Sequence, residues 1–176
     1  HCSVRLKSGY QMTDAKPLPI ESLESAKARV RGARILIVEE NPTDQLVIRD
    51  LLELAGAVVD IAGKDQSAMD KLVKEKFDVV IVNPQGSALN NAESVRRIRE
   101  KSKYARLCII GIIDPLIPEE CDRSVVADMD DYLPWPIDPE LMYRILAKWL
   151  TDKSEKATDQ HLGSAQSSKP LPVDIS

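Results

Sequence analysis

Apolar and polar positions follow two different periods between residues 33 and 150. Short runs of β-branched and other apolar residues have the pattern of buried parallel strands, whereas the longer segments between them repeat apolar residues every three or four positions, as amphipathic helices do. The predicted strands are residues 34–38, 57–62, 77–82, 106–113 and 131–134. The predicted helices are residues 39–56, 64–76, 91–101, 118–129 and 138–150, the fourth being the weakest.

The helical segments carry their own boundary signals. Gly56 is a plausible stop for the first helix, and Asp138 followed by Pro139 has the pattern of a helix N-cap and first turn. The apolar faces expected to pack on the sheet are Val47, Leu51 and Leu54 in the first helix and Ala68, Met69, Leu72 and Val73 in the second.

Strands that alternate with helices predict a parallel sheet covered on both faces and connected by right-handed crossovers. Ligands and reactive groups of such sheets gather at the carboxyl edge of the strands. The pattern alone therefore selects the side chains that follow each strand: Glu39, Glu40, Asn83, Ile113, Asp114 and Trp135.

The two ends of the chain lack this dense periodicity. Residues 1–32 are expected to be an N-terminal extension or linker from a preceding region, with Leu23, Ala26 and Val30 as the stripe of a short helix. Residues 151–176 are rich in Ser, Lys, Asp and Gln, a composition that predicts a C-terminal linker or tail.

Composition narrows the class of protein. The chain has 176 residues, 43% of them hydrophobic and 4% aromatic, so it can form a packed and mostly aliphatic core. Its net charge of −4 argues against a nucleic-acid surface, and the basic stretch 96–106 is interpreted as a solvated helix face. The three cysteines show neither disulfide nor zinc-ligand spacing, and no apolar run is long enough to cross a bilayer, so we expect a reduced, cytoplasmic setting without direct membrane contact.

Three motifs together resemble a known family. "ARILIVEENPTDQLVIRDLLELAGAVVDIA", "FDVVIVNPQ" and "MDDYLPWPIDPELMYRILAKWL" are similar to a response-regulator receiver domain, particularly the kind within hybrid histidine kinases. The resemblance covers about residues 33–150 and implies a flavodoxin-like (βα)5 fold, a doubly wound parallel sheet with strand order 2-1-3-4-5. In this family an acid pair after the first strand helps to hold Mg²⁺, and an aspartate after the third accepts a phosphoryl group.

The family also uses a Ser or Thr after the fourth strand, a Lys after the fifth, and often an aromatic switch residue. By resemblance, the acid pair falls on Glu39 and Glu40, and the phosphoacceptor position falls on an amide, Asn83. The hydroxyl position is Ile113, the lysine position is Trp135, and the switch aromatic is retained as Tyr132. The phosphoacceptor, hydroxyl and lysine positions therefore all depart from the family pattern.

These departures have chemical consequences. Phosphoryl transfer to a receiver needs a carboxylate nucleophile, a metal, and donors or cations for the transferring oxygens. Asn83 is neutral and cannot form an acyl phosphate, Ile113 has no hydroxyl, and Trp135 has no positive charge. Mg²⁺ prefers anionic oxygen ligands, so Glu39 and Glu40 are weak candidates for a metal site and no cofactor is expected.

Other interpretations of the same residues stay open. Asn83 either caps the turn before Pro84 or donates its amide to one of the two glutamates. Trp135 either fills the emptied pocket beside Ile113 or anchors a partner at the surface, and its bond to Pro136 is a candidate cis peptide.

The sequence favours a pseudo-receiver that is not an enzyme and that acts by docking to proteins, such as the kinase or other domains of the same signalling protein. The docking face favoured by the resemblance includes Tyr132, Met142 and Trp149. The alternative is a receiver that is still regulated by a metal, a ligand or phosphorylation at a non-standard residue. The sequence leaves open whether a second copy of the chain is among the partners.

Overall fold

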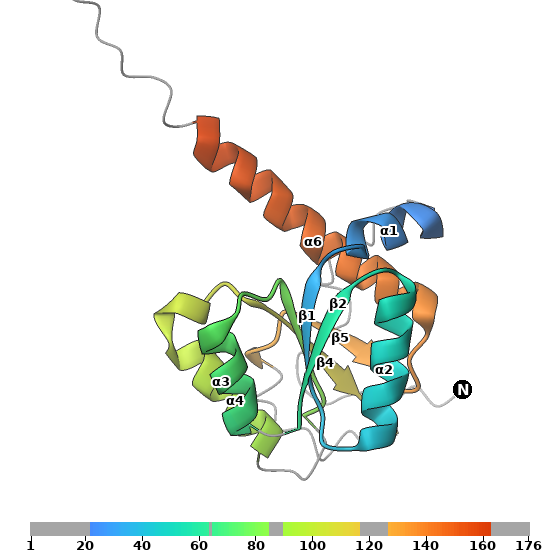
Figure 1. Cartoon of the computed structure of the whole chain (residues 1–176), viewed down its shortest axis with the longest axis vertical. Coiled ribbons are helices and arrows are strands. Elements are labelled where there is room, and N and C mark those ends of the chain that lie inside the picture. Colours follow the sequence, from blue (N-terminus) through green and yellow to red (C-terminus); the bar gives the residue numbers. More distant parts are fainter. Residues whose placement is uncertain (1–21, 64, 85–89, 117–126, 163–176) are drawn as a thin grey trace, which may run out of the picture.

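The computed structural model describes residues 22–63, 65–84, 90–116 and 127–162. Five parallel strands form one sheet in the order β2-β1-β3-β4-β5 (Figure 1). The strands are β1 (Arg34–Val38), β2 (Val58–Ala62), β3 (Val79–Val82), β4 (Cys108–Ile113) and β5 (Asp131–Pro134). The predicted order 2-1-3-4-5 is thus confirmed, and each strand lies within its predicted range.

The helices of the described residues are α1 (Leu23–Val30), α2 (Pro42–Leu54), α3 (Asp65–Lys74), α4 (Asn90–Glu100) and α6 (Pro139–Leu162), with a short 3-10 helix at Ser102–Tyr104. Two predicted boundary signals are confirmed. Gly56 follows α2 with a φ of 85°, which favours glycine, and the Asp138 carboxylate accepts from the Leu141 amide at 3.1 Å. Most of the helix predicted for residues 118–129 lies outside the described residues.

Two apolar clusters lie on opposite faces of the sheet. One lies beneath α1, α2 and α6 and the other beneath α3 and α4, so helices cover both faces (Figure 1). Residues of β1 alternate between the two clusters, Ile35 and Ile37 facing one and Leu36 and Val38 the other. This double burial explains why the central strands are almost continuously apolar.

The predicted helix faces need correction. In α2 the buried side chains are Ile48 and Leu52, whereas Val47 and Leu54 are exposed. In α3 the predicted Val73 is also exposed. Both helices carry more apolar residues than one buried face needs, so the apolar period alone did not identify the face that packs on the sheet.

Helix α1 is part of the packed structure. Ala26 and Val30 are fully buried in the cluster that α6 also contributes to, and Lys27 lies over the Tyr143 ring at 5.7 Å. Ser22 caps the helix, its hydroxyl accepting from the Ser25 amide at 3.2 Å. The short helix predicted from the stripe at residues 23–30 is therefore confirmed, and it packs on α6.

Helix α6 is longer than the sequence indicated. It continues past residue 150 to Leu162 and extends beyond α1, away from the sheet (Figure 1). The predicted end of this helix at residue 150 is therefore wrong, whereas the assignment of residues 151–176 to a linker or tail stays a prediction. Neither Pro nor Gly interrupts residues 151–162, and Gly163 follows them directly, so the first helix-terminating residue comes thirteen positions after Leu150.

Candidate functional site

The ends of β1 and β3 bring Glu39 and Asn83 together. The two strands are hydrogen-bonded neighbours, with Val38 paired to Val82. The backbone N–H of Asn83 donates to the Val38 carbonyl at 3.2 Å. Each residue follows the last residue of its strand, so both side chains lie at the carboxyl edge of the sheet. This is the edge that the alternation of strands and helices selected.

Both carboxylate oxygens of Glu39 accept hydrogen bonds from the chain itself. Asn83 Nδ2 donates to Oε2 at 2.7 Å, and the backbone N–H of Asn41 donates to Oε1 at 2.8 Å. Only 2% of Glu39 is exposed. A buried carboxylate is stable when it is fully hydrogen-bonded, and here a neutral amide and a helix N-cap residue supply the donors. The interaction that the sequence left open for Asn83 is confirmed, with Glu39 as its acceptor.

These residues do not fit the magnesium site implied by the resemblance. Each carboxylate oxygen of Glu39 already accepts a hydrogen bond. Asn83 directs a side-chain N–H toward this carboxylate, where a Mg²⁺ site would need an anionic oxygen. Glu40 is half-buried, and the Asp114 carboxylate accepts from the Leu116 amide at 2.8 Å. No group of three or more His, Cys, Asp or Glu side chains gathers around a common point within the described part of the chain.

Ile113 ends β4, the neighbour of β3, and Trp135 follows β5, the next strand along the same edge. Ile113 pairs with Pro134, and the backbone N–H of Trp135 donates to the Ile113 carbonyl at 2.8 Å. Trp135 is half-buried and packs against the cluster beneath α1, α2 and α6. The Trp135–Pro136 bond is cis, as the sequence suggested. Trp135 therefore contributes apolar packing where the family pattern has a cation.

Tyr132 is half-buried against the cluster beneath α3 and α4, next to a glycine in β4 that the sequence interpretation did not single out. A Cβ on Gly111 would lie 2.3 Å from the Met129 sulfur and 3.3 Å from Tyr132 Cδ1. Gly111 thus provides the space into which Met129 and Tyr132 pack. The role of Tyr132 as a switch remains a prediction.

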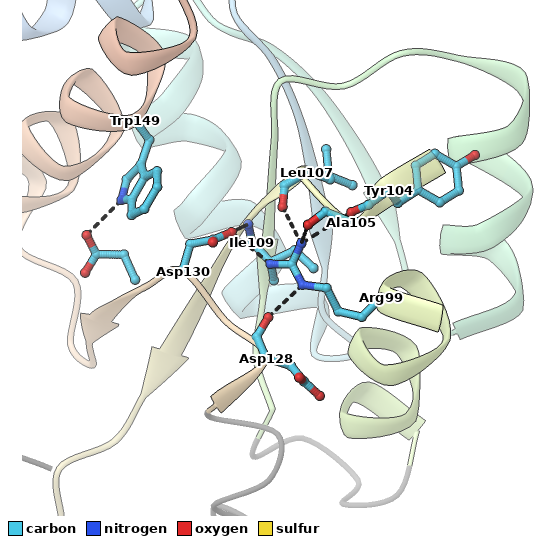
Figure 2. Close-up of polar contacts among 9 residues, drawn as sticks. Arg99, Tyr104, Ala105, Leu107, Ile109, Asp128, Asp130 and Trp149 are labelled. Atoms are coloured by element: carbon cyan, nitrogen blue, oxygen red, sulfur yellow. Dashed lines mark hydrogen bonds and ion pairs between the residues drawn. The ribbon is translucent and has the colours of Figure 1, made fainter. Parts of the chain in front are cut away.

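Arg99 on α4 was also missed. Its guanidinium donates to the backbone carbonyls of Asp128 at 2.8 Å and Leu107 at 2.7 Å, and to the Asp130 carboxylate at 2.8 Å (Figure 2). Further, longer bonds reach Tyr104 and Ala105 at 3.3 Å. One side chain therefore joins α4 to the segments that lead into β4 and β5. In the sequence Arg99 is one of several arginines in a basic stretch, and nothing there distinguishes it.

Asp131 connects β5 to α6. Its Oδ2 accepts from the Trp149 indole N–H at 2.8 Å, the contact drawn beside the Arg99 group in Figure 2, and from Lys148 at 3.2 Å. The Lys148 side chain is only 7% exposed, so this ion pair is largely removed from water. The adjacent aspartates in "MDDYLP" were the available signal for Asp130 and Asp131, because carboxylates at the start of a partly buried strand need hydrogen-bond donors.

The docking face expected from the resemblance is partly occupied by these contacts. Met142 is fully buried and cannot touch a partner, which corrects the prediction. Trp149 is half-buried and packs on the cluster beneath α1, α2 and α6, with its indole N–H bonded to Asp131. Helix α1 also packs on α6, so part of the helix that carries Met142 and Trp149 is covered by the chain itself.

Comparisons with known proteins agree with this geometry. No protein-family model matches the chain. The sensor histidine kinase GacS of Pseudomonas protegens is 30% identical over 138 residues, which cover 77% of this chain and 14% of the kinase. The chain spans only 14% to 16% of the length of the first curated sensor proteins that it matches.

Solved structures give the same picture. The receiver domain of the sensor histidine kinase PA1611 from Pseudomonas aeruginosa, crystallised with a magnesium ion in its active site cleft, is 27% identical with a TM-score of 0.62. The match covers 68% of this chain and 98% of that one. The receiver domain of Ssk1 from Saccharomyces cerevisiae, crystallised with the histidine phosphotransfer protein Ypd1, is 16% identical with a TM-score of 0.61, covering 70% and 92%.

The five-stranded sheet in the order 2-1-3-4-5, with helices on both faces, defines the flavodoxin-like fold of CheY-type proteins. The sequence likeness then identifies the family: the chain contains a receiver domain of a two-component signalling system. Among the helices that the structure describes, none is both long enough and apolar enough to cross a membrane.

Proposed function

We propose that this receiver domain works without aspartyl phosphorylation and acts by docking to other proteins of its signalling system. The observation that carries the proposal is the hydrogen bond from Asn83 Nδ2 to Glu39 Oε2 at 2.7 Å. The residue at the family's phosphoacceptor position is thus a neutral hydrogen-bond donor, and it stabilises the buried Glu39 carboxylate directly. The domain then keeps the fold of a receiver but not its nucleophile.

Two further positions support the proposal. Ile113 has no hydroxyl, and Trp135 packs against apolar residues. The hydroxyl and the cation that would contact the phosphoryl oxygens are therefore both replaced. A domain with these features does no chemistry of its own. Its partners are expected among two-component proteins: the matched kinase contains such a region, and the Ssk1 receiver domain is crystallised with a phosphotransfer protein.

Incubation of the whole chain with acetyl phosphate and Mg²⁺, followed by intact-mass measurement, tests this proposal. We expect no increase in mass by a phosphoryl group under conditions that label a receiver with an aspartate at the equivalent position. Mapping by peptide mass separates Asn83 from other acceptors. A stable adduct on any side chain of this domain contradicts phosphorylation independence and favours a receiver regulated at a non-standard residue.

A further inference from the structure

The surface around the end of α4 carries a charge opposite to that of the whole chain. Residues 96–106 contain six basic side chains and one acidic side chain, whereas the chain has a net charge of −4. One of the six, Arg99, binds carbonyls and the Asp130 carboxylate within the fold. The other five are exposed: Arg96, Arg97, Lys101, Lys103 and Arg106. The stretch that the sequence indicated as a solvated helix face therefore forms a positive surface on an acidic protein.

A groove between α3 and α4 lies at this positive surface. Met69 of α3 lines it together with Arg97, Glu100 and Lys101 at the end of α4, and its volume is about 310 Å³. Only 7% of Met69 is exposed, so its side chain forms an apolar floor. Arg97 and Lys101 are four residues apart, so they lie on the same side of the helix end. We call this feature the α3–α4 groove: an apolar floor beside two cations and one carboxylate.

Val73 extends the apolar floor of the groove. It follows Met69 by four residues, so it lies on the same side of α3, and 63% of it is exposed. The ends of α3 and α4 are held together, because the Tyr104 hydroxyl donates to the Leu72 carbonyl at 2.8 Å through a buried hydrogen bond. An exposed valine alone is ordinary, but beside this groove it enlarges the area that a partner's apolar side chain can cover.

Helix stabilisation accounts for only part of the positive charge. Lys74 lies in the last turn of α3 and Arg97 in the last turn of α4, where cations interact favourably with the helix dipole. Lys103 and Arg106 lie beyond the end of α4, in the 3-10 helix and in the segment before β4. The dipole effect falls off within the last turn, so it does not explain these two charges. They fit a negatively charged partner at the surface instead.

The side chains at the groove favour a protein over a nucleic acid as that partner. Proteins that bind single-stranded nucleic acid stack the bases on aromatic side chains. Among the described residues of α3, α4 and the 3-10 helix, Tyr104 is the one aromatic side chain, and it is buried. Glu100 also places a carboxylate in the groove, where it would repel a phosphate backbone. An amphipathic helix with an apolar face flanked by carboxylates can cover the floor and pair with the cations.

We propose that the α3–α4 groove is the docking site for a protein partner that presents such an acidic, amphipathic helix. This inference rests on the proposed docking function and names its surface and the chemistry of its partner. The partner's apolar residues cover Met69 and Val73, and its carboxylates pair with Arg97 and Lys101. Because the binding measurement uses no phosphoryl donor, its failure is distinct from a failure of phosphorylation independence.

The test uses the whole chain and two synthetic helical peptides with the same leucine face, one flanked by glutamates and the other by lysines. We expect saturable binding of the glutamate peptide in fluorescence anisotropy, weakened by added salt, and little binding of the lysine peptide. Backbone amide shifts in NMR titration are expected to concentrate in residues 69–76 and 95–104.

Two kinds of variant separate the charged and apolar parts of the groove. Combined Arg97→Glu and Lys101→Glu should weaken binding of the glutamate peptide by about tenfold and reverse the preference in favour of the lysine peptide. Val73→Ser should weaken binding by about threefold without changing the charge, since it removes an apolar contact at an exposed position.

Combined Arg29→Glu and Arg31→Glu is the matched control. It makes the same change in net charge at two exposed arginines at the end of α1, which packs on the other face of the sheet, and should leave the affinity unchanged. Far-UV circular dichroism verifies that each variant is folded. Equal binding of both peptides, shifts centred on other elements, or an effect of the α1 variant as large as that of the α4 variant overturns the proposal. Tighter binding of a single-stranded oligonucleotide or of phosphatidylserine vesicles than of the glutamate peptide overturns it in favour of a nucleic acid or a membrane.

Discussion

The side-chain amide of Asn83 and the buried carboxylate of Glu39 are hydrogen-bonded at 2.7 Å across the ends of two adjacent parallel strands. A carboxylate can only accept at neutral pH, so the amide's donor group satisfies it without a metal ion. An aspartate at the same place would present another acceptor instead. The identity of residue 83 thus decides whether the Glu39 carboxylate is neutralised by a hydrogen bond within the chain or requires a cation.

Asn83→Asp is expected to destabilise the domain at neutral pH when a chelator is present. The substitution removes a donor from buried Glu39 and places a second negative charge beside it, a loss of about 2 kcal/mol in the free energy of unfolding. Mg²⁺ should recover part of this loss by neutralising the pair. Thermal unfolding with EDTA and with MgCl2 measures both effects.

Asn83→Ala is the control for that experiment. It removes the same hydrogen bond but adds no charge, so we expect a loss of stability that Mg²⁺ does not reverse. Equal responses of the two variants to Mg²⁺ would show that the added carboxylate is not the cause.

Receiver chemistry should return only when several positions are reversed. We expect acetyl phosphate to label the triple variant Asn83→Asp, Ile113→Thr, Trp135→Lys more efficiently than Asn83→Asp alone. The reason is that the threonine and lysine supply the donor and the cation for the phosphoryl oxygens. Intact mass over a time course measures the labelled fraction. Labelling of the triple variant no faster than that of the single variant would contradict this view of positions 113 and 135.

Arg99→Lys is expected to lower the stability by about 2 kcal/mol, although it conserves charge. The guanidinium reaches Asp128, Leu107 and the Asp130 carboxylate at once, and an ammonium cannot donate in all these directions (Figure 2). Urea unfolding gives the change, and a double-mutant cycle with Asp130→Asn isolates the ion-pair part. Exposed Arg96 is the matched control: Arg96→Lys should change little.

Tyr143 predicts a specific response to alkaline pH. Burial raises the pKa of its phenol above the ordinary value of 10.0, and nearby Lys27 offsets part of that rise. The folded protein therefore holds this proton more tightly than the unfolded chain does. Its contribution to stability is fully present below about pH 10 and is lost as pH rises through the folded-state pKa.

Tyr143→Phe removes this titration together with the hydrogen bond from the hydroxyl to the Leu51 carbonyl at 2.6 Å. The variant should be less stable than the parent chain by about 1 kcal/mol at pH 7, with the difference shrinking above pH 10. Chemical denaturation across this pH range measures it. A difference that is constant with pH would contradict the assignment.

The sequence predicted the sheet well because its central strands are buried on both faces, which leaves short apolar runs such as residues 79–82 that have few alternatives. The sequence also predicted that Glu39 and Asn83 lie at one edge of the sheet, since the carboxyl ends of parallel strands lie at the same edge. It failed at α2, where Val47 and Leu54 were assigned to the core, because apolar residues on both sides of a helix leave its packing face ambiguous.

Other features depended on tertiary contacts that a sequence pattern does not contain. The role of Arg99 requires carbonyls from segments distant along the chain, and the length of α6 follows from the absence of a helix terminator rather than from apolar periodicity. The choice between Glu39 and Glu40 as the acceptor of Asn83 depends on which side chain turns inward, and that was visible only in the structure.

The continuation of α6 to Leu162 fixes the direction and the rotation with which this helix ends. Residues 151–162 carry the chain about 18 Å beyond residue 150, and each residue of a helix turns its successor by about 100°. Inserting one residue after Leu150 would therefore turn the following segment by more than a quarter of a circle, whereas inserting a full heptad would nearly preserve its setting. The packing of α6 against α1 thus fixes the rotation of α6 about its own axis, and the continuous helix keeps that rotation as far as Leu162.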